Sequence, residues 1–288
     1  MTKTLIILAG GTSSRMKRSE SARLSDSVKH QADTISKALI PVNNRPILDY
    51  LLYNAKMAGI KNVIIVTGAD NSMFKDRYGK ESKGNAFHGL TISYAIQHIP
   101  AGKNKPMGTA DAVHQALEQY PGVQQEFFLV CNCDNLYSVE SFNTLIENND
   151  SNAFINYDRD TLKYSAERIA NFAITRVNAD GYLMDIIEKP SDIDMARNKS
   201  GGDSTRVSMN LWKFYGPQFY AFLETCPVHP ERDEKELPTA VLNMIKVYPR
   251  CMKAISFSEH VPDLTGKEDI AVLNDYLSTH YSHLDWTN

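Results

Sequence analysis

Cysteine is scarce in this chain of 288 residues, which contains four. So few cysteines exclude the dense disulfide framework of small secreted domains and are typical of a reducing compartment. Cys131 and Cys133 could form half of a metal site, but no second Cys or His pair has matching spacing. Their separation instead predicts two thiols on one face of a buried strand.

Long apolar runs are also missing. The run Leu5–Ala9 is too short for a transmembrane helix or a signal peptide, and it leads directly into two glycines. No other stretch of the sequence approaches membrane-spanning length. We therefore expect no membrane partner and a cytoplasmic location.

Neither sign of charge dominates the composition, and the formal net charge at pH 7 is −3. A general nucleic-acid binder is expected to be basic, so no nucleic-acid partner is predicted. Hydrophobic residues make up 42% and charged residues 23%, as in ordinary globular proteins. A chain of this length can bury a core without disulfides or a structural metal.

Several familiar catalytic signatures are absent. The eight histidines include no His-Glu-x-x-His pair, and the chain has neither a Walker A sequence nor a Gly-x-Gly-x-x-Gly fingerprint. Ser13 and Ser14 have no His or Asp partner in a recognisable motif, which disfavours a nucleophilic hydrolase.

The first half instead alternates short apolar runs with helical patterns, which predicts an α/β fold with a parallel sheet covered by helices. The second half is less regular and is predicted to continue the same sheet. The expected strands are Leu5–Ala9, Val63–Thr67, Thr91–Ile96, Phe127–Cys131, Asn152–Tyr157, Phe172–Val177, Leu183–Ile187, Val207–Phe214 and Met252–Phe257. The expected helices are Pro46–Ala58, Gly108–Gln119, Gly216–Leu223, Leu237–Ile245 and Glu268–Tyr281.

Two turns that follow predicted strands carry charged or flexible residues. The turn Gly10-Gly11-Thr12-Ser13-Ser14-Arg15 offers close backbone approach, free N–H groups and a planar cation, all of which suit phosphate. Asp134 follows another buried strand, where a lone carboxylate is costly without a cation, although it could also cap the next helix. Because such sheets bind ligands at the carboxyl ends of their strands, both turns are expected at a ligand site.

Two polar stretches, Lys17–Ser36 and Asp192–Asp203, have little apolar periodicity and are predicted to be solvated loops. The first leaves directly from the glycine turn. The alternative for it is therefore a lid that orders over a bound nucleotide.

Five motifs occur in the order typical of the sugar-phosphate nucleotidylyltransferases, and the chain resembles that family over residues 3–215. The motifs are Leu8-Ala9-Gly10-Gly11-x-x-x-Arg15-Met16 with Lys37-Ala38-Leu39-Ile40-Pro41-Val42, Gly108-Thr109-Ala110-Asp111-Ala112, Cys133-Asp134-Asn135, Ile187-Glu188-Lys189-Pro190 and Val207-Ser208-Met209-Asn210-Leu211-Trp212. The resemblance implies one domain over residues 1–288 with a Rossmann-like, mixed and mostly parallel sheet flanked by helices. Residues 1–150 would mainly bind nucleotide, and residues 151–288 would mainly bind the acceptor and form the C-terminal helices.

The resemblance also implies a reaction, the transfer of NMP from a nucleoside triphosphate to a sugar 1-phosphate. The acceptor phosphate attacks the α-phosphorus in line, and pyrophosphate leaves. The implied catalytic residues are Arg15 and Lys37, which would contact the triphosphate, and Lys189, which would contact the acceptor phosphate. The implied cofactor is Mg²⁺, with Asp134 as ligand and Asp263 as candidate second ligand, although Asp263 could also be a simple turn residue.

The remaining implied site residues fall into two groups. The nucleotide group is Leu8, Ala9, Gly10, Gly11, Thr12, Gln97, Gly108 and Thr109. The acceptor group is Asn135, Glu188, Lys189 and Asn210. Asp111 is expected to lie on a helix surface, and Glu231–Glu236 is expected to be a solvated loop.

Three departures from the family pattern leave questions open. One is that Asp263 is displaced by one position from the second metal carboxylate of the family's Trp-x-Asp-x-Gly motif. The spacing from Arg15 to Lys37 is longer than usual, which makes Lys29 a rival for the role of Lys37. A long loop separates Gln97 from Gly108 and leaves the base undefined. The alternatives are the same transfer to a non-sugar acceptor, such as a phosphorylated alcohol or a molybdopterin-type cofactor, and a non-catalytic regulator that binds nucleotide or sugar phosphate. The oligomeric state also stays open.

Overall fold

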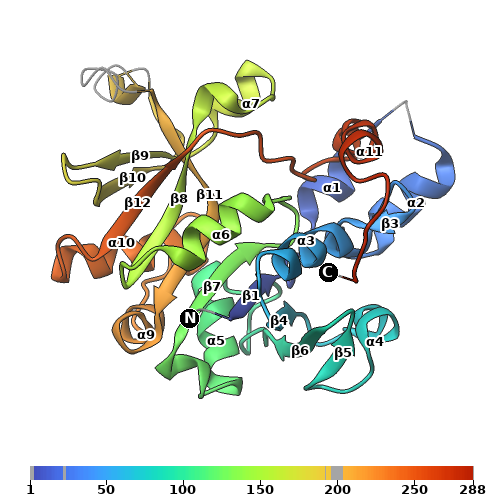
Figure 1. Cartoon of the computed structure of the whole chain (residues 1–288), viewed down its shortest axis with the longest axis horizontal. Helices are drawn as coiled ribbons and strands as arrows, with labels where there is room; N and C mark the ends of the chain where they lie inside the picture. The colour runs from blue at the N-terminus through green and yellow to red at the C-terminus, as the bar shows by residue number, and fades with distance from the viewer. Residues whose placement is uncertain (1–2, 22–23, 192, 196–203, 288) are drawn as a thin grey trace.

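The computed structural model describes residues 3–21, 24–191, 193–195 and 204–287, and its centre is one mixed sheet. The ten strands are β1 (Thr4–Leu8), β4 (Asn62–Thr67), β5 (Asn85–Phe87), β6 (Leu90–Ile96), β7 (Phe127–Asn132), β8 (Asn152–Asp158), β9 (Ile174–Val177), β10 (Leu183–Ile187), β11 (Arg206–Tyr215) and β12 (Met252–Phe257). Their order is β10-β9-β11-β7-β1-β4-β6-β5, and β8 pairs with both β11 and β12 (Figure 1).

The four central strands, β7-β1-β4-β6, pair in parallel. Leu5 and Ile7 of β1 face one core and Ile6 faces the other, and all three are fully buried because helices cover both sides of the sheet. Strand β4 follows β1 in the chain and pairs with one edge of β1, whereas the later strand β7 pairs with its opposite edge. The carboxyl ends of β1 and β7 therefore flank a topological switch point, where α/β sheets bind ligands.

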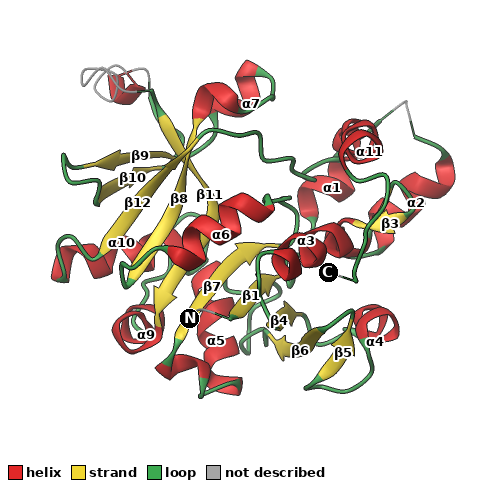
Figure 2. Ribbon diagram, viewed as in Figure 1, coloured by secondary structure: helices red, strands yellow, loops and turns green. Residues whose placement is uncertain are grey.

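Helices cover both faces of the sheet (Figure 2). One core contains residues from α3 (Ile47–Met57), α4 (Ser72–Tyr78) and α6 (Val139–Glu147). The opposite core contains residues from α5 (Thr109–Gln119), α9 (Gly216–Glu224) and α10 (Leu237–Val247). A third cluster joins the small hairpin of β2 (Pro41–Val42) and β3 (Arg45–Pro46) to α1 (Ser14–Arg18), α2 (Asp26–Thr34), α3 and α11 (Lys267–His280).

The predicted α/β fold class is confirmed, and each predicted strand and helix has a counterpart whose ends differ by at most two residues. Helices α1, α4, α6 and α7 (Ala166–Ala170) and strand β5 have no counterpart among the predictions. Each is short, so an apolar period has few turns in which to repeat. Cys131 and Cys133 are buried in the same core, as predicted. None of the helices in the described residues is long and apolar enough to cross a membrane.

The prediction of a solvated loop at Lys17–Ser36 is wrong in part, because α2 lies within this stretch. The helix is capped by Ser25, whose hydroxyl accepts a hydrogen bond from the Val28 amide at 3.4 Å. Ala32 on α2 is fully buried in the third cluster. Because α2 buries so few apolar side chains, its sequence lacks the apolar periodicity that would predict a helix. The other predicted loop, Asp192–Asp203, lies outside the described residues except for 193–195.

Lys267, the first residue of α11, fixes this segment to the rest of the molecule. Its side chain is buried, and its ammonium lies 2.6 Å from the Asp33 carboxylate on α2. The ammonium also donates to the Ser19 carbonyl at 2.9 Å, and the Lys267 amide donates to the Ser19 hydroxyl at 2.8 Å. A buried ammonium is stable only with such partners. Lys267 therefore links the ends of α1 and α2 to α11.

We predict that Lys267→Met releases α2 from α11, because methionine keeps the apolar stem but removes the ammonium that Asp33 and Ser19 contact. The free energy of unfolding should fall by about 1–3 kcal/mol, as partners lose a buried hydrogen bond. Hydrogen–deuterium exchange should speed up in α2, while Lys246→Met on the exposed side of α10 should leave it unchanged. Equal exchange of α2 in the Lys267 variant and the wild type would contradict this role.

Candidate active site

The glycine turn after β1 forms one wall of a cavity of about 310 Å³ at the switch point. Gly10 lies so close to its neighbours that a Cβ there would approach Gln97 Oε1 to 3.2 Å and the Thr67 carbonyl carbon to 3.4 Å. After the turn, Ser13 takes a left-handed conformation with φ 54° and leads into α1. The backbone can thus approach a ligand closely here, and Arg15 follows on the first turn of α1.

Two carboxylates from distant parts of the chain meet beside this turn. Asn135, directly after Asp134, forms an antiparallel bridge with Asp263. The Leu264 amide donates to the Asp134 carbonyl at 2.8 Å, and the Leu136 amide donates to the Pro262 carbonyl at 2.8 Å. These backbone bonds hold the end of β7 against the 262–264 segment. The side chains of Asp134 and Asp263 are only 16% and 10% exposed, so their charges need compensation.

Lys37 supplies part of this compensation from the 3₁₀ helix η1 (Lys37–Leu39). Its ammonium forms an ion pair with Asp134 Oδ2. Burial alone would lower the pKa of Lys37, but the contact with Asp134 outweighs burial and raises this pKa above its ordinary value. Lys37 therefore stays positively charged. Its rival Lys29 lies on α2, 3.6 Å from Asp26, so the structure places Lys37 and not Lys29 in the cavity.

Arg168 on α7 compensates the charge of the second carboxylate, Asp263. No motif in the sequence predicted this role for Arg168. Its Nη2 lies 2.8 Å from Asp263 Oδ2, and its Nη1 donates to Asp269 at the start of α11. The Thr265 hydroxyl donates to Asp263 Oδ2 at 2.9 Å. Burial and the nearby charge of Asp134 raise the pKa of Asp263 to about 6, against the opposing charges of Arg168 and Lys37.

The donor set fits a hard divalent cation with few protein ligands. Within the described residues there is no group of three or more His, Cys, Asp and Glu that could hold a metal. Mg²⁺ in proteins is commonly held by one or two carboxylates, with substrate phosphates and water completing its octahedron. Asp134 and Asp263 provide two such carboxylates, and Asp134 shares a cavity with the glycine turn. The residues therefore fit a cation that arrives with a phosphorylated ligand.

Gln97, just past β6, lies in the same cavity with a fixed orientation. Its Nε2 donates to the Gly108 carbonyl at 2.9 Å and to Asp111 Oδ2 at 2.8 Å. Asp111 also accepts from Gln115 Nε2 at 2.8 Å and is 9% exposed. The prediction that Asp111 lies on a helix surface is therefore wrong, because its carboxylate faces Gln97. The Gly108 carbonyl and the Asp111 carboxylate both accept from Nε2, which fixes the orientation of the Gln97 carboxamide. Its oxygen Oε1 therefore lies beside Gly10 and can accept a hydrogen bond from a ligand.

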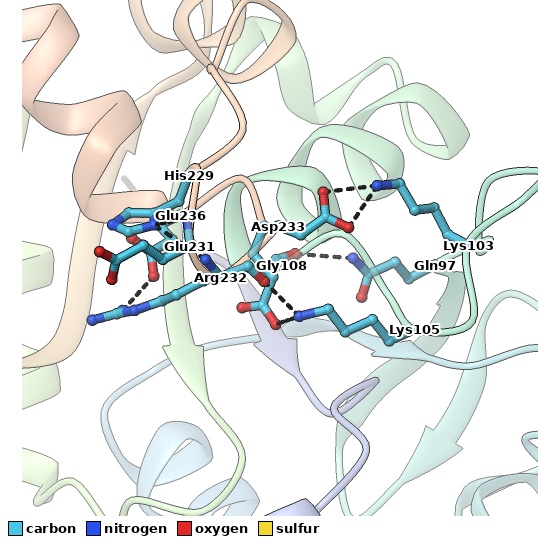
Figure 3. A network of polar contacts seen from close by, with 10 residues as sticks. Gln97, Lys103, Lys105, Gly108, His229, Glu231, Arg232, Asp233 and Glu236 are labelled. Atoms are coloured by element: carbon cyan, nitrogen blue, oxygen red, sulfur yellow. Dashed lines mark hydrogen bonds and ion pairs between the residues drawn. The ribbon is translucent and has the colours of Figure 1, made fainter.

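The 98–107 loop is bound to the segment before α10 (Figure 3). Lys103 and Lys105 form ion pairs with Asp233 and Glu234, the latter at 2.8 Å. The Lys235 carbonyl accepts from the Ala110 amide at 2.9 Å. The segment Glu231–Glu236 is a loop before α10, as predicted, but it is half-buried against the 98–107 loop and not fully solvated.

Gly108 and Thr109 meet the same segment. Gly108 has φ 97°, and a Cβ at this position would lie 2.6 Å from the Lys235 carbonyl oxygen. Only glycine fits both the backbone angle and this close approach. The Thr109 hydroxyl accepts from the Leu237 amide at 2.9 Å. Both residues line the cavity, but the contacts described here are with the segment before α10 and not with a ligand.

A second cavity of about 220 Å³ adjoins the first at Asp134, which lines both, and Asp263 lines the second. This second cavity is also lined by Asn135, Glu188 and Asn210 among others. Asn210 takes φ 60° where the pairing of β11 with β8 shifts between Ser208 and Trp212, so an irregularity in the strand exposes it to the cavity. Glu188 lies 3.5 Å from Arg232, another residue that the motifs missed.

Lys189 lines a wider cavity of about 1130 Å³, and not the smaller one. Arg15 lines all three cavities and therefore lies at their junction. The structure brings every predicted nucleotide residue, with Lys37 and Asp134, to the first cavity. These residues are Leu8, Ala9, Gly10, Gly11, Thr12, Gln97, Gly108 and Thr109.

Comparison with known proteins defines the family to which this chain belongs. The sequence model of the family described as nucleotidyl transferase matches residues 4–246. Since this match covers most of the chain, the protein belongs to the nucleotidyl transferase family.

Individual relatives are more distant. The chain is 27% identical over 135 residues to the D-glycero-alpha-D-manno-heptose 1-phosphate guanylyltransferase of Aneurinibacillus thermoaerophilus, a match that covers 47% of each protein. It is 25% identical over 252 residues to the bifunctional protein GlmU of Staphylococcus epidermidis, which covers 85% of this chain and 46% of that protein. The matches thus span just under half the length of these curated relatives.

The crystal structure of a UDP-glucose pyrophosphorylase complexed with UDP-glucose has the same fold as this chain. The TM-score is 0.72 at 16% sequence identity, and the match covers 97% of this chain and 99% of that one. At this identity the likeness establishes the Rossmann-like architecture, and the chemistry has to be argued from the site itself.

Proposed function

We propose that the protein transfers NMP from a nucleoside triphosphate to a sugar 1-phosphate, with release of pyrophosphate and with Mg²⁺ as cofactor. The observation that carries this proposal is that Asp134 lines both cavities, while the bridge between Asn135 and Asp263 brings a second carboxylate beside it in the smaller cavity. One cavity has the phosphate-binding glycine turn, and the other is lined by polar side chains. A cation held by both carboxylates would lie where the two substrates meet.

The chain's own residues would perform distinct tasks. Arg15 and Lys37 bind the triphosphate and orient its α-phosphorus toward the second cavity. Lys189 binds the acceptor phosphate from the adjoining wide cavity, which Glu188 also lines, and Glu188 accepts a hydrogen bond from a sugar hydroxyl. Asn135 and Asn210 offer further hydrogen bonds to the acceptor. Mg²⁺, when bound, would neutralise phosphate charge and make the α-phosphorus more electrophilic. The reaction needs alignment and charge compensation more than covalent chemistry.

Gln97 is our candidate for contact with the base. Asp111 and the Gly108 carbonyl occupy its amide hydrogens, so Gln97 can only accept a hydrogen bond from a ligand through Oε1. The base must therefore present an N–H group to this position.

The wide cavity favours a second candidate, the same transfer to a bulkier or non-sugar phosphorylated acceptor. Its volume of about 1130 Å³ exceeds what a single sugar phosphate fills. Its lining includes the aromatic rings of Tyr164, Phe172 and Tyr276, which suit an acceptor with an apolar part.

Pyrophosphate release with each of the four nucleoside triphosphates and a panel of acceptors tests the proposal. The panel should contain sugar 1-phosphates and phosphorylated alcohols. Turnover with a sugar 1-phosphate supports the first candidate, and turnover with a phosphorylated alcohol alone supports the second. Tight nucleotide binding without turnover on any acceptor would instead indicate a regulator.

We predict that Asp134→Ala lowers kcat/KM by at least about a hundredfold, because the site loses a carboxylate that would hold the cation compensating the charge of the reacting phosphates. The variant should remain folded, since Asp134 is held mainly by its backbone. Circular dichroism checks folding, and pyrophosphate release gives the rate. Asp180→Ala, which removes an exposed carboxylate paired with Arg250, serves as control and should keep the wild-type rate. A wild-type rate in Asp134→Ala would refute the assignment.

A second prediction concerns Asp111. In Asp111→Ala the Gln97 carboxamide loses one of its two acceptors and can rotate. Nucleotide affinity, measured by isothermal titration calorimetry, should fall about tenfold, which is the value of one well-placed hydrogen bond. Asp76→Ala on the exposed face of α4 is the matched control. Unchanged affinity in the Asp111 variant would show that Gln97 does not contact the base.

A further inference from the structure

The carboxylates of Asp134 and Asp263 each have a cation of their own. Lys37 pairs with Asp134, and Arg168 pairs with Asp263. All four side chains are largely buried, with exposed fractions of 14%, 16%, 22% and 10% for Lys37, Asp134, Arg168 and Asp263. Solvent therefore screens these charges weakly, and the interactions among them are strong.

The two cations differ in how firmly they are held. Asp134 is the one carboxylate that Lys37 contacts within the described residues, and Lys37 reaches it through a flexible four-carbon stem. Arg168 has three partners. It contacts Asp263 and Asp269 with different nitrogens, and its guanidinium carbon lies 4.4 Å from the centre of the Tyr164 ring. Lys37 can thus exchange partners at low cost, whereas Arg168 is fixed.

This arrangement affects a divalent cation that approaches alone. The attraction of the two carboxylates for it is offset by repulsion from Lys37 and Arg168 at short range. A triphosphate changes the balance, because it adds several negative charges. Lys37 can then leave Asp134 for the phosphate oxygens, and the freed carboxylate becomes available to the metal.

We propose that Lys37 and Arg168 are internal counter-cations of the Asp134–Asp263 pair, so that a divalent cation enters this site only together with a triphosphate. Lys37 is the exchangeable member, and Arg168 is a positioning residue that holds Asp263 through Oδ2. Asp263 Oδ1 accepts a hydrogen bond from the uncharged Thr265 hydroxyl at 3.0 Å and keeps a second lone pair for the metal. This inference rests on the proposed function for the identity of the ligands. Its consequence is ordered loading, in which the free enzyme does not retain metal.

Equilibrium dialysis against Mn²⁺, with and without inorganic triphosphate, tests the proposal without any turnover. Triphosphate serves as probe because it lacks a base and does not depend on nucleotide preference. Manganese in excess on the protein side counts as bound. The wild type should bind Mn²⁺ weakly alone and take up one equivalent with triphosphate. Equal affinity in both conditions, or no uptake in either, would overturn the proposal.

Variants of Arg168 separate charge from packing. Arg168→Met should bind Mn²⁺ alone at least about tenfold more tightly than the wild type, because a short-range repulsion is removed. Arg168→Lys keeps the charge and should behave as the wild type. Arg176→Met is the matched control, since Arg176 forms an exposed ion pair with Asp185 far along the sheet edge. Unchanged or weaker Mn²⁺ binding by Arg168→Met would overturn the proposal.

Lys37→Met keeps the test decisive if Arg168→Met does not fold. This variant should also bind Mn²⁺ alone at least about tenfold more tightly. Its triphosphate-dependent uptake should fall, because the exchange partner is gone. No gain in affinity for Mn²⁺ alone would overturn the proposal.

Pyrophosphate release by the wild type separates failure of this inference from failure of the proposed function. An enzyme that turns over but binds Mn²⁺ alone as tightly as with triphosphate refutes the inference only. A protein that shows triphosphate-dependent uptake without turnover on any acceptor supports the inference and refutes the function.

Discussion

The antiparallel bridge between Asn135 and Asp263 places two carboxylates from distant parts of the chain side by side, and the rest of the site is arranged around this contact. Two like charges with little exposure repel each other and lose hydration. The structure compensates them with Lys37, which follows the glycine turn and the α1–α2 segment, and with Arg168, which comes from α7. The position of each of these elements is therefore coupled to the same charge balance.

The surrounding fold gives this contact its two neighbouring cavities. The parallel strands end at the switch point between β1 and β7, which brings the glycine turn and Asp134 together. On the side of the glycine turn, the segment before α10 is bound to the 98–107 loop through ion pairs and backbone hydrogen bonds. On the other side, Glu188 and Asn210 reach the smaller cavity from the antiparallel half of the sheet. Lys267 completes the frame by fixing α1 and α2 to α11.

Local patterns were enough to predict nine of the ten strands of the main sheet, the longer helices and the glycine turn, because apolar periodicity and a glycine turn are properties of neighbouring residues. The residues that sequence reasoning missed act through long-range pairing. Arg168 belongs to a five-residue helix without a motif, and its role depends on Asp263 and Asp269. The role of Asp111 depends on the position of the Gln97 side chain, which comes from a distant strand end. The local sequence around Asp111 therefore predicted only a polar position on a helix. Such contacts are decided by how distant elements pack.

The most direct test of the central claim is a crystal structure with Mn²⁺ and a triphosphate ligand, in which anomalous scattering locates the metal. The account predicts a manganese peak within coordination distance of carboxylate oxygens of both Asp134 and Asp263. It also predicts that the Lys37 ammonium lies on the phosphates and that Arg168 still contacts Asp263 and Asp269. A metal bound elsewhere, or Lys37 still paired with Asp134 in the loaded site, would contradict it.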